Sequence, residues 1–150
     1  MSATILHPTD FSEHSMCALD LAASLARSQH ARLVLLHVVP DLKAVLRAEM
    51  AAGHRPSEHF EEDMGGYRHE MSARLQAQEV PGGGVAVERV LREGPVAETI
   101  LRVAEELPGT LIVMGSHGKR GIEKVLLGSV AESVLRRAAC PVVTVRQPGR

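Results

Sequence analysis

Glycine and serine residues late in the chain have the types and the spacing of a phosphate-binding loop. Gly115 and Gly118 follow an apolar run at 110–114, and Gly128 and Ser129 precede a segment with the pattern of a helix. Glycine allows a positive φ and lets phosphate oxygens approach where a Cβ would block them. The Ser129 hydroxyl and the first free N–H groups of the helix can donate to an anion. An ordinary strand-to-helix loop carries similar glycines, so the spacing leaves both interpretations open.

A carboxylate near the amino end of the chain is the second chemical candidate. Asp10 comes just after an apolar run that ends with Pro8 and is followed by Thr9. Its oxygens can accept hydrogen bonds from an adenine amino group or a ribose hydroxyl, or they can cap the helix expected to begin at Ser12. The sequence by itself leaves both roles open.

The polar side chains after Gly115 also have two open roles. His117, Lys119 and Arg120 can steer or clamp a phosphate, or they can form a solvated loop tip. The spacing of His54, His59 and His69 is typical of a polar helix face, so no protein side chain is expected to hold a metal. His7 and His37 belong to buried-type strands and are expected to be hydrogen-bonded residues of the core or of the strand ends at the switch point. Fast phosphoryl transfer needs a metal-holding carboxylate together with a group that orients the nucleophile. The sequence has no such set beyond Asp10 and the loop cations, so no catalytic residue is predicted.

Hydrophobic patterning predicts alternating strands and helices in one domain, residues 1–150. Strands are expected at 4–8, 32–39, 85–91, 110–114 and 141–145, and helices at 12–30, 42–50, 57–78, 94–107 and 128–137. The helical segment at about 41–80 is the least regular and is expected to be the variable part. The alternation predicts a doubly wound α/β fold, a parallel sheet with helices on both faces. Such sheets bind ligands at the carboxyl ends of the strands, where the strand order reverses.

The composition excludes several classes of partner. With 45% hydrophobic residues and a formal net charge of −1, the chain lacks both the profile of a disordered protein and the basic field of a nucleic-acid binder. Phe11, Phe60 and Tyr67 are its only aromatic residues, too few for base-stacking platforms. No apolar run is long enough for a membrane span. Cys17 and Cys140 have no CxxC spacing and are expected to be free thiols in a reducing cytoplasm.

The pattern Gly115-x2-Gly118-x9-Gly128-Ser129 resembles the G-x2-G-x9-G-[ST] signature of the ATP-binding branch of the universal stress protein family. The segments at 126–132 and 140–143 resemble that family as well, and the likeness covers nearly the whole chain. The resemblance implies a five-stranded parallel sheet in the order 3-2-1-4-5, the adenine nucleotide alpha hydrolase-like fold. It also implies a small cytoplasmic ATP-binding protein that acts as a nucleotide-dependent stress-response or regulatory module.

The same resemblance gives each candidate loop a part of the nucleotide. The turn after the first strand would touch the nucleoside, the end of the second strand would meet the adenine, and the glycine loop would hold the phosphates. ATP is the implied cofactor, with Mg²⁺ or Mn²⁺ as an optional bridge between its phosphates, and hydrolysis is expected to be slow at most. The implied nucleotide-binding residues are Pro8, Thr9, Asp10, Val39, Met114, Gly115, Gly118, Gly128, Ser129 and Val130.

The resemblance also implies an assembly and leaves one alternative function open. Family members commonly form homodimers through the last strand, where Val142, Val143 and Val145 would present an apolar edge. A further protein partner is expected, but the sequence does not identify it. The alternative is a nucleotide-free protein-interaction module of the same fold, in which the glycine loop is only structural. The intact glycine signature and Asp10 favour nucleotide binding.

Overall fold

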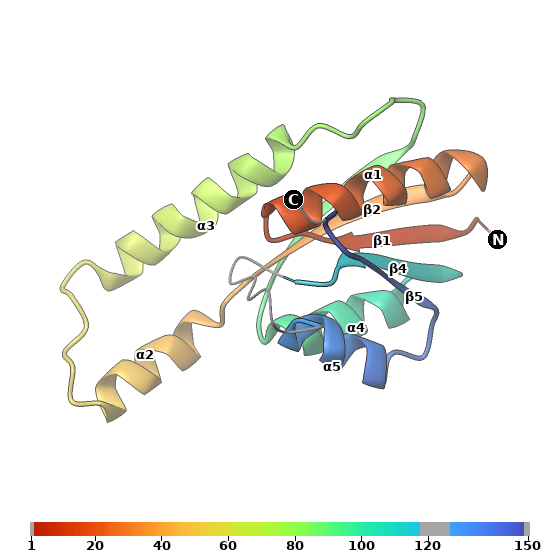
Figure 1. Ribbon diagram of the computed structural model, residues 1–150. Helices are drawn as coiled ribbons and strands as arrows, with labels where there is room; N and C mark the ends of the chain where they lie inside the picture. Colours follow the sequence, from red (N-terminus) through yellow and green to blue (C-terminus); the bar gives the residue numbers. More distant parts are fainter. Residues whose placement is uncertain (1, 118–126, 149–150) are drawn as a thin grey trace.

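The computed structural model describes residues 2–117 and 127–148, in which strands and helices surround one parallel sheet (Figure 1). The sheet has the order β3-β2-β1-β4-β5, so the expected fold is confirmed. The strands are β1 (Thr4–Pro8), β2 (Arg32–Val39), β3 (Val87–Glu93), β4 (Thr110–Gly115) and β5 (Val142–Val145). The helices are α1 (Glu13–Ser28), α2 (Leu42–Ala51), α3 (Phe60–Ala77), α4 (Val96–Glu106) and α5 (Ser129–Arg137).

The first strand, β1, occupies the centre of the sheet. Its Thr4 lies opposite Arg32 of β2 on one side and Thr110 of β4 on the other. Every residue of β1 is buried, as expected for a parallel strand with neighbours at both edges and helices on both faces. The chain winds outward from β1 in both directions, so the strand order reverses between β1 and β4. A ligand crevice is expected at the carboxyl ends of these two strands.

Two helical layers cover opposite faces of the sheet, α1 on one side and α4 with α5 on the other (Figure 1). Alternate residues of β2 point into the two layers, because side chains alternate across a strand. Leu35 packs with Ala22 in the layer under α1, while Leu36 packs with Ile100 of α4 and Val134 of α5. The alanines of α1 allow that helix to lie close to the sheet.

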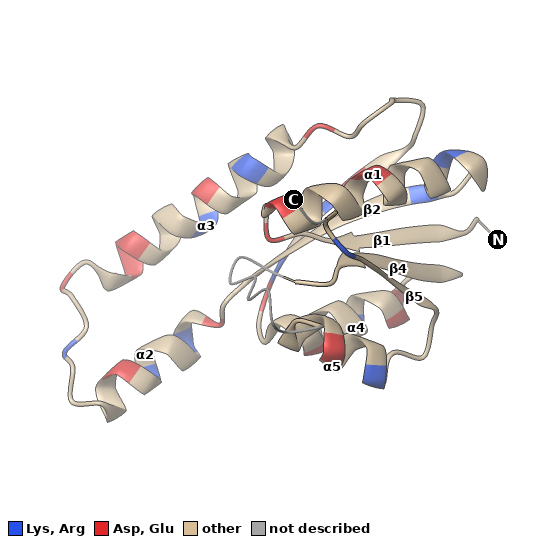
Figure 2. Cartoon of the chain, in the orientation of Figure 1, with Lys and Arg blue, Asp and Glu red and all other residues tan. Residues whose placement is uncertain are grey.

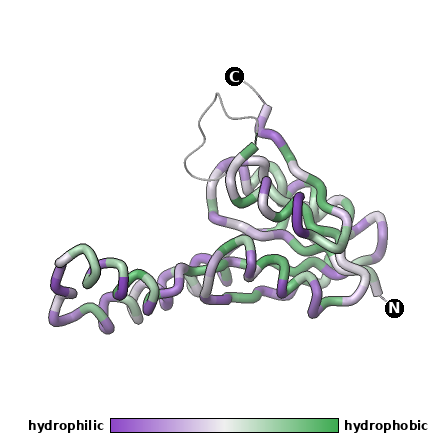
Figure 3. The backbone as a smooth tube through the Cα atoms, turned by 90° about the horizontal axis from the view of Figure 1, so that it is seen from below, coloured by the Kyte–Doolittle hydropathy of each residue, from purple (hydrophilic) through white to green (hydrophobic). Residues whose placement is uncertain are grey.

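The segment between β2 and β3 forms a two-helix arm, α2 and α3, which projects beyond the carboxyl ends of the strands (Figures 1 and 3). Only Leu42 of α2 and Met71 and Leu75 of α3 are buried, and charged residues lie along both helices (Figure 2). The two helices expected at 42–50 and 57–78 are therefore confirmed, although α3 begins at Phe60. The arm is attached to the domain chiefly by the carboxyl half of α3.

The side chain of Arg89 fixes the carboxyl end of α3 to the sheet. Arg89 of β3 donates from Nε to the carbonyl of Leu75, at 3.0 Å, and from Nη2 to the carbonyl of Gln78, at 2.7 Å. These bonds add side-chain donors to carbonyls at the carboxyl end of α3, where the helical bonding pattern ends. On α3 itself, Arg68 forms an ion pair with Glu93, with 2.9 Å between Nη2 and Oε2.

The boundaries of β3 and α4 also differ from the sequence-based expectation. The third strand covers 87–93 and not 85–91, because its pairing with β2 runs from Leu33 opposite Val87 to Val39 opposite Glu93. Helix α4 begins after Pro95, which is its N-cap with φ −60° and ψ 130°, and not at Gly94. Propensity alone does not set such boundaries, whereas pairing and capping do.

Candidate nucleotide site

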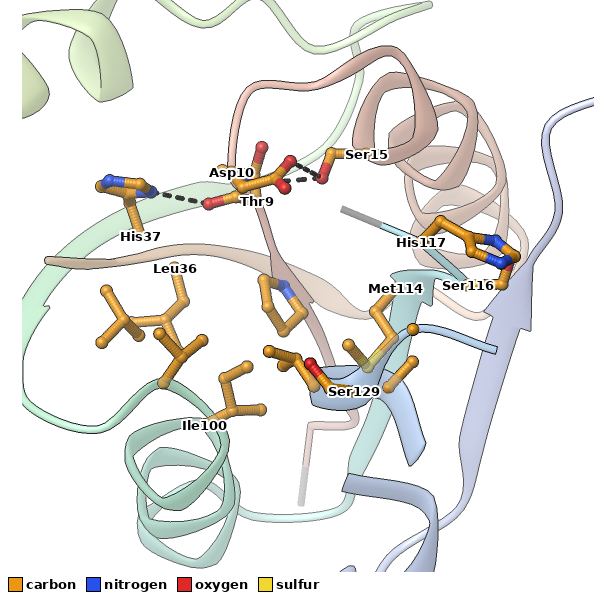
Figure 4. A pocket seen from close by; sticks show the side chains of 17 residues that line it. Thr9, Asp10, Ser15, Leu36, His37, Ile100, Met114, Ser116, His117 and Ser129 are labelled. Atoms are coloured by element: carbon orange, nitrogen blue, oxygen red, sulfur yellow. Dashed lines mark hydrogen bonds between the residues drawn. The ribbon is translucent and has the colours of Figure 1, made fainter. Parts of the chain in front are cut away.

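A cavity of about 540 Å³ opens at the carboxyl ends of β1 and β4, where the strand order reverses (Figure 4). Its position is the one expected for a doubly wound sheet. Residues from both sequence-predicted loops meet there with residues of β2, α4 and α5. The lining residues are Pro8, Thr9, Asp10, Ser15, Leu36, His37, Val38, Val96, Ile100, Met114, Gly115, Ser116, His117, Gly128, Ser129, Val130 and Ala131.

One part of the cavity is an aliphatic slot between the sheet and α4. Leu36 and Val38 of β2, Ile100 of α4 and Met114 of β4 are buried members of the same core cluster, so the slot is a recess in that core. Val96, in the first turn of α4, also lines it. Apolar walls with a few placed polar groups are typical of small-molecule sites. The slot can hold a flat apolar group such as a nucleobase without an aromatic partner.

The end of the second strand differs from what the resemblance implied. Val38 lines the cavity and Val39 does not. The Val39 carbonyl instead accepts a hydrogen bond from the N–H of Gly94, at 3.0 Å, as part of the pairing between β2 and β3.

The turn after β1 is held by a dense set of hydrogen bonds. The Thr9 N–H donates to the carbonyl of Leu36 at 2.8 Å, which continues the pairing of β1 with β2. Asp10 Oδ1 accepts from the N–H of Ser12 at 2.9 Å and from Ser15 Oγ at 2.8 Å. Asp10 therefore secures the start of α1 and lines the cavity at once, so the two roles left open by the sequence are compatible. A carboxylate offers about four acceptor positions, enough for a ligand as well.

Two buried histidines support the strands beneath this turn. His7 Nδ1 lies 2.8 Å from the carbonyl of Val113, and His37 Nδ1 lies 2.7 Å from the carbonyl of Thr9. A carbonyl only accepts, so each Nδ1 carries a proton and donates. Burial lowers the pKa of His7 to about 4, against the opposing effects of the Val113 bond and the Asp10 charge. Both histidines are hydrogen-bonded core residues, as expected from their strands.

The described glycines of the loop do not have positive φ angles, so that part of the expectation was wrong. Gly128 has φ −70° and ψ 157°, and Gly115 is not among the glycines with positive φ. A Cβ added to Gly115 would lie 3.0 Å from the carbonyl carbon and oxygen of His14 and 3.3 Å from the carbonyl oxygen of His117. Gly115 is thus required by the close approach of β4 to the start of α1. Gly118 lies outside the described residues.

The amino end of α5 faces the cavity. Gly128 is the N-cap and its own N–H donates to the carbonyl of Ser116 at 2.6 Å, so this amide is already used. The first hydrogen bond within α5 runs from the N–H of Glu132 to the carbonyl of Gly128. The backbone amides of the three residues between them precede this first bond and therefore have no carbonyl partner within the helix. Those residues, Ser129, Val130 and Ala131, all line the cavity. Their N–H groups and the helix dipole favour an anion there.

His117 lines the cavity at the same end. Its Nδ1 lies 3.0 Å from the hydroxyl of the buried Ser116, and its ring centroid lies 5.6 Å from that of His14. Lys119 and Arg120, the other candidates for phosphate steering, lie outside the described residues.

Sequence reasoning missed several lining residues. Ser15 is three residues after Ser12, the N-cap of α1, and five after Asp10, so this spacing could have indicated it. Val96 and Ile100 gave no local signal, because they read as ordinary apolar positions of α4. Among the described residues, no group of three or more His, Cys, Asp or Glu side chains could hold a metal ion. No helix within 2–117 or 127–148 is long and apolar enough to cross a bilayer.

The strand order, with a cavity at the reversal point and a helix amino end facing that cavity, defines a doubly wound α/β domain. Within that class the chain belongs to the universal stress protein family, because the sequence model of this family matches residues 1–146. The resemblance drawn from the glycine pattern is thereby confirmed.

The similarity to known relatives extends over nearly the whole chain. Universal stress protein MJ0531 of Methanocaldococcus jannaschii is 35% identical over 144 residues, which cover 96% of this chain and 82% of that protein. The solved structure of MJ0577 from the same organism is 29% identical and aligns with a TM-score of 0.82 over 100% of this chain and 99% of the other. A universal stress protein solved in complex with cAMP is 25% identical, with a TM-score of 0.62 over 98% of each chain.

Proposed function

We propose that this protein binds ATP in the cavity between β1, β4 and α5. The observation that carries the proposal is the meeting of three complementary groups in one cavity. The aliphatic slot suits the base, the Asp10 turn suits the ribose or the base amino group, and the amino end of α5 with Ser129 suits phosphate.

The relative in complex with cAMP supports an adenine nucleotide as the ligand class. That ligand joins an adenine, a ribose and a phosphate, the three groups that the proposal assigns to the cavity. The choice of ATP over shorter nucleotides is our proposal, based on the glycine signature. Mg²⁺ or Mn²⁺ would bridge phosphates without protein ligands, and hydrolysis would be slow at most, since the described residues of the site offer no set of groups for phosphoryl transfer.

The proposed role is that of a cytoplasmic stress-response or regulatory module whose partner choice depends on nucleotide occupancy. Such a switch requires different affinities for the nucleotide in two conformations. We further propose a homodimer through β5, which is an edge strand with half-buried Val142, Val143 and Val145. An unpaired edge of this kind offers free N–H and C=O groups to a second copy.

A charge reversal at the phosphate end tests the binding proposal. Ser129→Asp places a carboxylate at the first residue of α5, where it favours the helix dipole and so preserves folding. The same carboxylate repels phosphate, and we expect ATP affinity to fall about tenfold or more by calorimetric titration of nucleotide-stripped protein with Mg²⁺. Ser57→Asp adds the same charge ahead of α3, outside the cavity, and should leave affinity unchanged.

The alternative function gives a different result in the same experiment. If the chain is a nucleotide-free interaction module with a structural glycine loop, folded and stripped wild-type protein does not bind ATP. If wild-type protein binds but Ser129→Asp binds equally well, the phosphate is not at α5 and the proposed arrangement is wrong.

A further inference from the structure

Three side chains from separate elements form a stack on the α1 side of the sheet, behind the cavity. The ring centroids of Phe11 and His37 are 4.6 Å apart, and Arg74 Cζ lies 4.5 Å from the Phe11 centroid. His37 belongs to β2, Phe11 to the turn before α1, and Arg74 to α3. No residue of α3 lines the cavity. The stack therefore connects the arm to the binding turn, and of its three members only His37 lines the cavity.

His37 links the stack to the cavity wall. Its Nδ1–H donates to the Thr9 carbonyl at 2.7 Å, a bond that Figure 4 shows running from the imidazole to the turn. Thr9 is buried and directly precedes Asp10. Fixing this carbonyl therefore fixes the direction in which the chain presents the Asp10 carboxylate.

Phe11 needs the stack for a separate reason. Its φ is 64°, in the left-handed region that a residue with a Cβ rarely adopts. Such a conformation persists only where the surroundings hold it. Here the Phe11 N–H donates to Thr9 Oγ1 at 3.0 Å, and the ring is held between an imidazole and a guanidinium, both favourable contacts for an aromatic face.

We infer that Arg74 is a positioning residue for the nucleotide site and acts through Phe11 and His37. Arg74 keeps the Phe11 ring over His37, whose Nδ1–H holds Thr9 and Asp10 in the geometry that meets the nucleoside. The inference rests on the nucleotide-binding function proposed above and adds that α3 helps to set the affinity. Binding couplings are reciprocal, so nucleotide at the Asp10 turn stabilises the docking of α3 by the same factor.

The first test compares ATP affinities of matched α3 variants by calorimetry. Arg74→Ala removes the cation above Phe11 and should weaken ATP binding about two- to fivefold. Arg74→Lys keeps the cation and should restore most of the affinity. Arg68→Ala takes the same charge from the same helix but breaks only a solvent-exposed ion pair with Glu93, which contributes little to the docking of α3, so its affinity should equal that of the wild type. Arg74 is exposed, so the variants are expected to fold.

The second test follows the coupling itself by hydrogen exchange of the carboxyl half of α3. ATP should slow exchange at residues 71–77 in the wild type, although none of them lines the cavity. The Arg74→Ala variant should lose this ATP-dependent difference. If Arg74 only stabilised the fold, its removal would speed exchange in both states and leave the ATP-dependent difference in place.

The outcomes separate this inference from the proposed function. Wild-type protein that binds ATP, with Arg74→Ala unchanged in both affinity and ATP-dependent protection, overturns the inference alone. Equal weakening by Arg68→Ala and Arg74→Ala also overturns it, because the effect would then be general electrostatics. Folded, stripped wild-type protein that does not bind ATP overturns both.

Discussion

Replacement of Gly115 by alanine tests why glycine ends β4. The added Cβ would lie 3.0 Å from two backbone atoms of His14, in the first turn of α1, and 3.3 Å from the carbonyl oxygen of His117. Carbon contacts are favourable at about 3.5–4.0 Å, and a backbone within a helix cannot rotate away as a side chain can. Overpacking of this kind costs about 1–3 kcal/mol of stability. We therefore expect Gly115→Ala to destabilise the nucleotide-free protein by that amount.

Gly65→Ala is the matched control for this substitution. Gly65 lies inside α3, and a Cβ there would meet no atom within 4 Å. The same change should stabilise the protein by about 0.5–1 kcal/mol, because alanine is the better helix former. Urea denaturation followed by circular dichroism measures both effects. If Gly115→Ala leaves the free energy of unfolding unchanged and lowers only nucleotide affinity, Gly115 serves the phosphate and the packing explanation is wrong.

Two further predictions concern protonation and assembly. Burial lowers the pKa of His7 from 6.5 to about 4, so the unfolded chain binds a proton at this imidazole more readily than the folded chain does. The stability that neutral His7 contributes is therefore complete above pH 6.5 and is lost as the pH falls toward 4. Between pH 7 and pH 4 the wild type should lose about 3 kcal/mol more stability than His7→Gln in urea titrations, and equal losses would contradict the assignment. For assembly, Ser116 N–H donates to the Val145 carbonyl and Ile112 N–H to the Pro141 carbonyl, so by ladder alternation the Thr144 N–H points to the open edge of β5. Thr144→Pro should convert a wild-type dimer into a monomer in sedimentation; a persistent dimer would exclude β5 as the interface, and a monomeric wild type would exclude the dimer.

The stack at Phe11 suggests a role for the arm formed by α2 and α3. Most of its residues are exposed, and its buried contacts with the sheet come from Met71 and Leu75. Segments with few buried contacts open at low free-energy cost. Arg74 lies between those two buried residues, so a change in the binding turn reaches the point where the arm joins the domain. Under the proposed function, this is the place at which nucleotide occupancy would alter the surface offered to a partner.

The sequence by itself determined the order of strands and helices and the end of the sheet at which the site lies. Hydrophobic periodicity is a local property, so buried strands such as the one at 32–39 can be predicted from their own residues. The glycine pattern and Asp10 identified two loops, and the alternation of elements placed both loops at the carboxyl ends of parallel strands. The family followed from the same residues.

Only the tertiary structure decided what individual residues do at the site. In the structure Gly115 lies close to the backbone of α1, and the Gly128 N–H donates to the carbonyl of Ser116. Val96 and Ile100 line the cavity. The structure also stacks Arg74 on Phe11, two residues far apart in the chain. The physical reason is the same in each case: these contacts join elements distant in sequence, and they depend on how closely helices pack on the sheet, which local propensity does not specify.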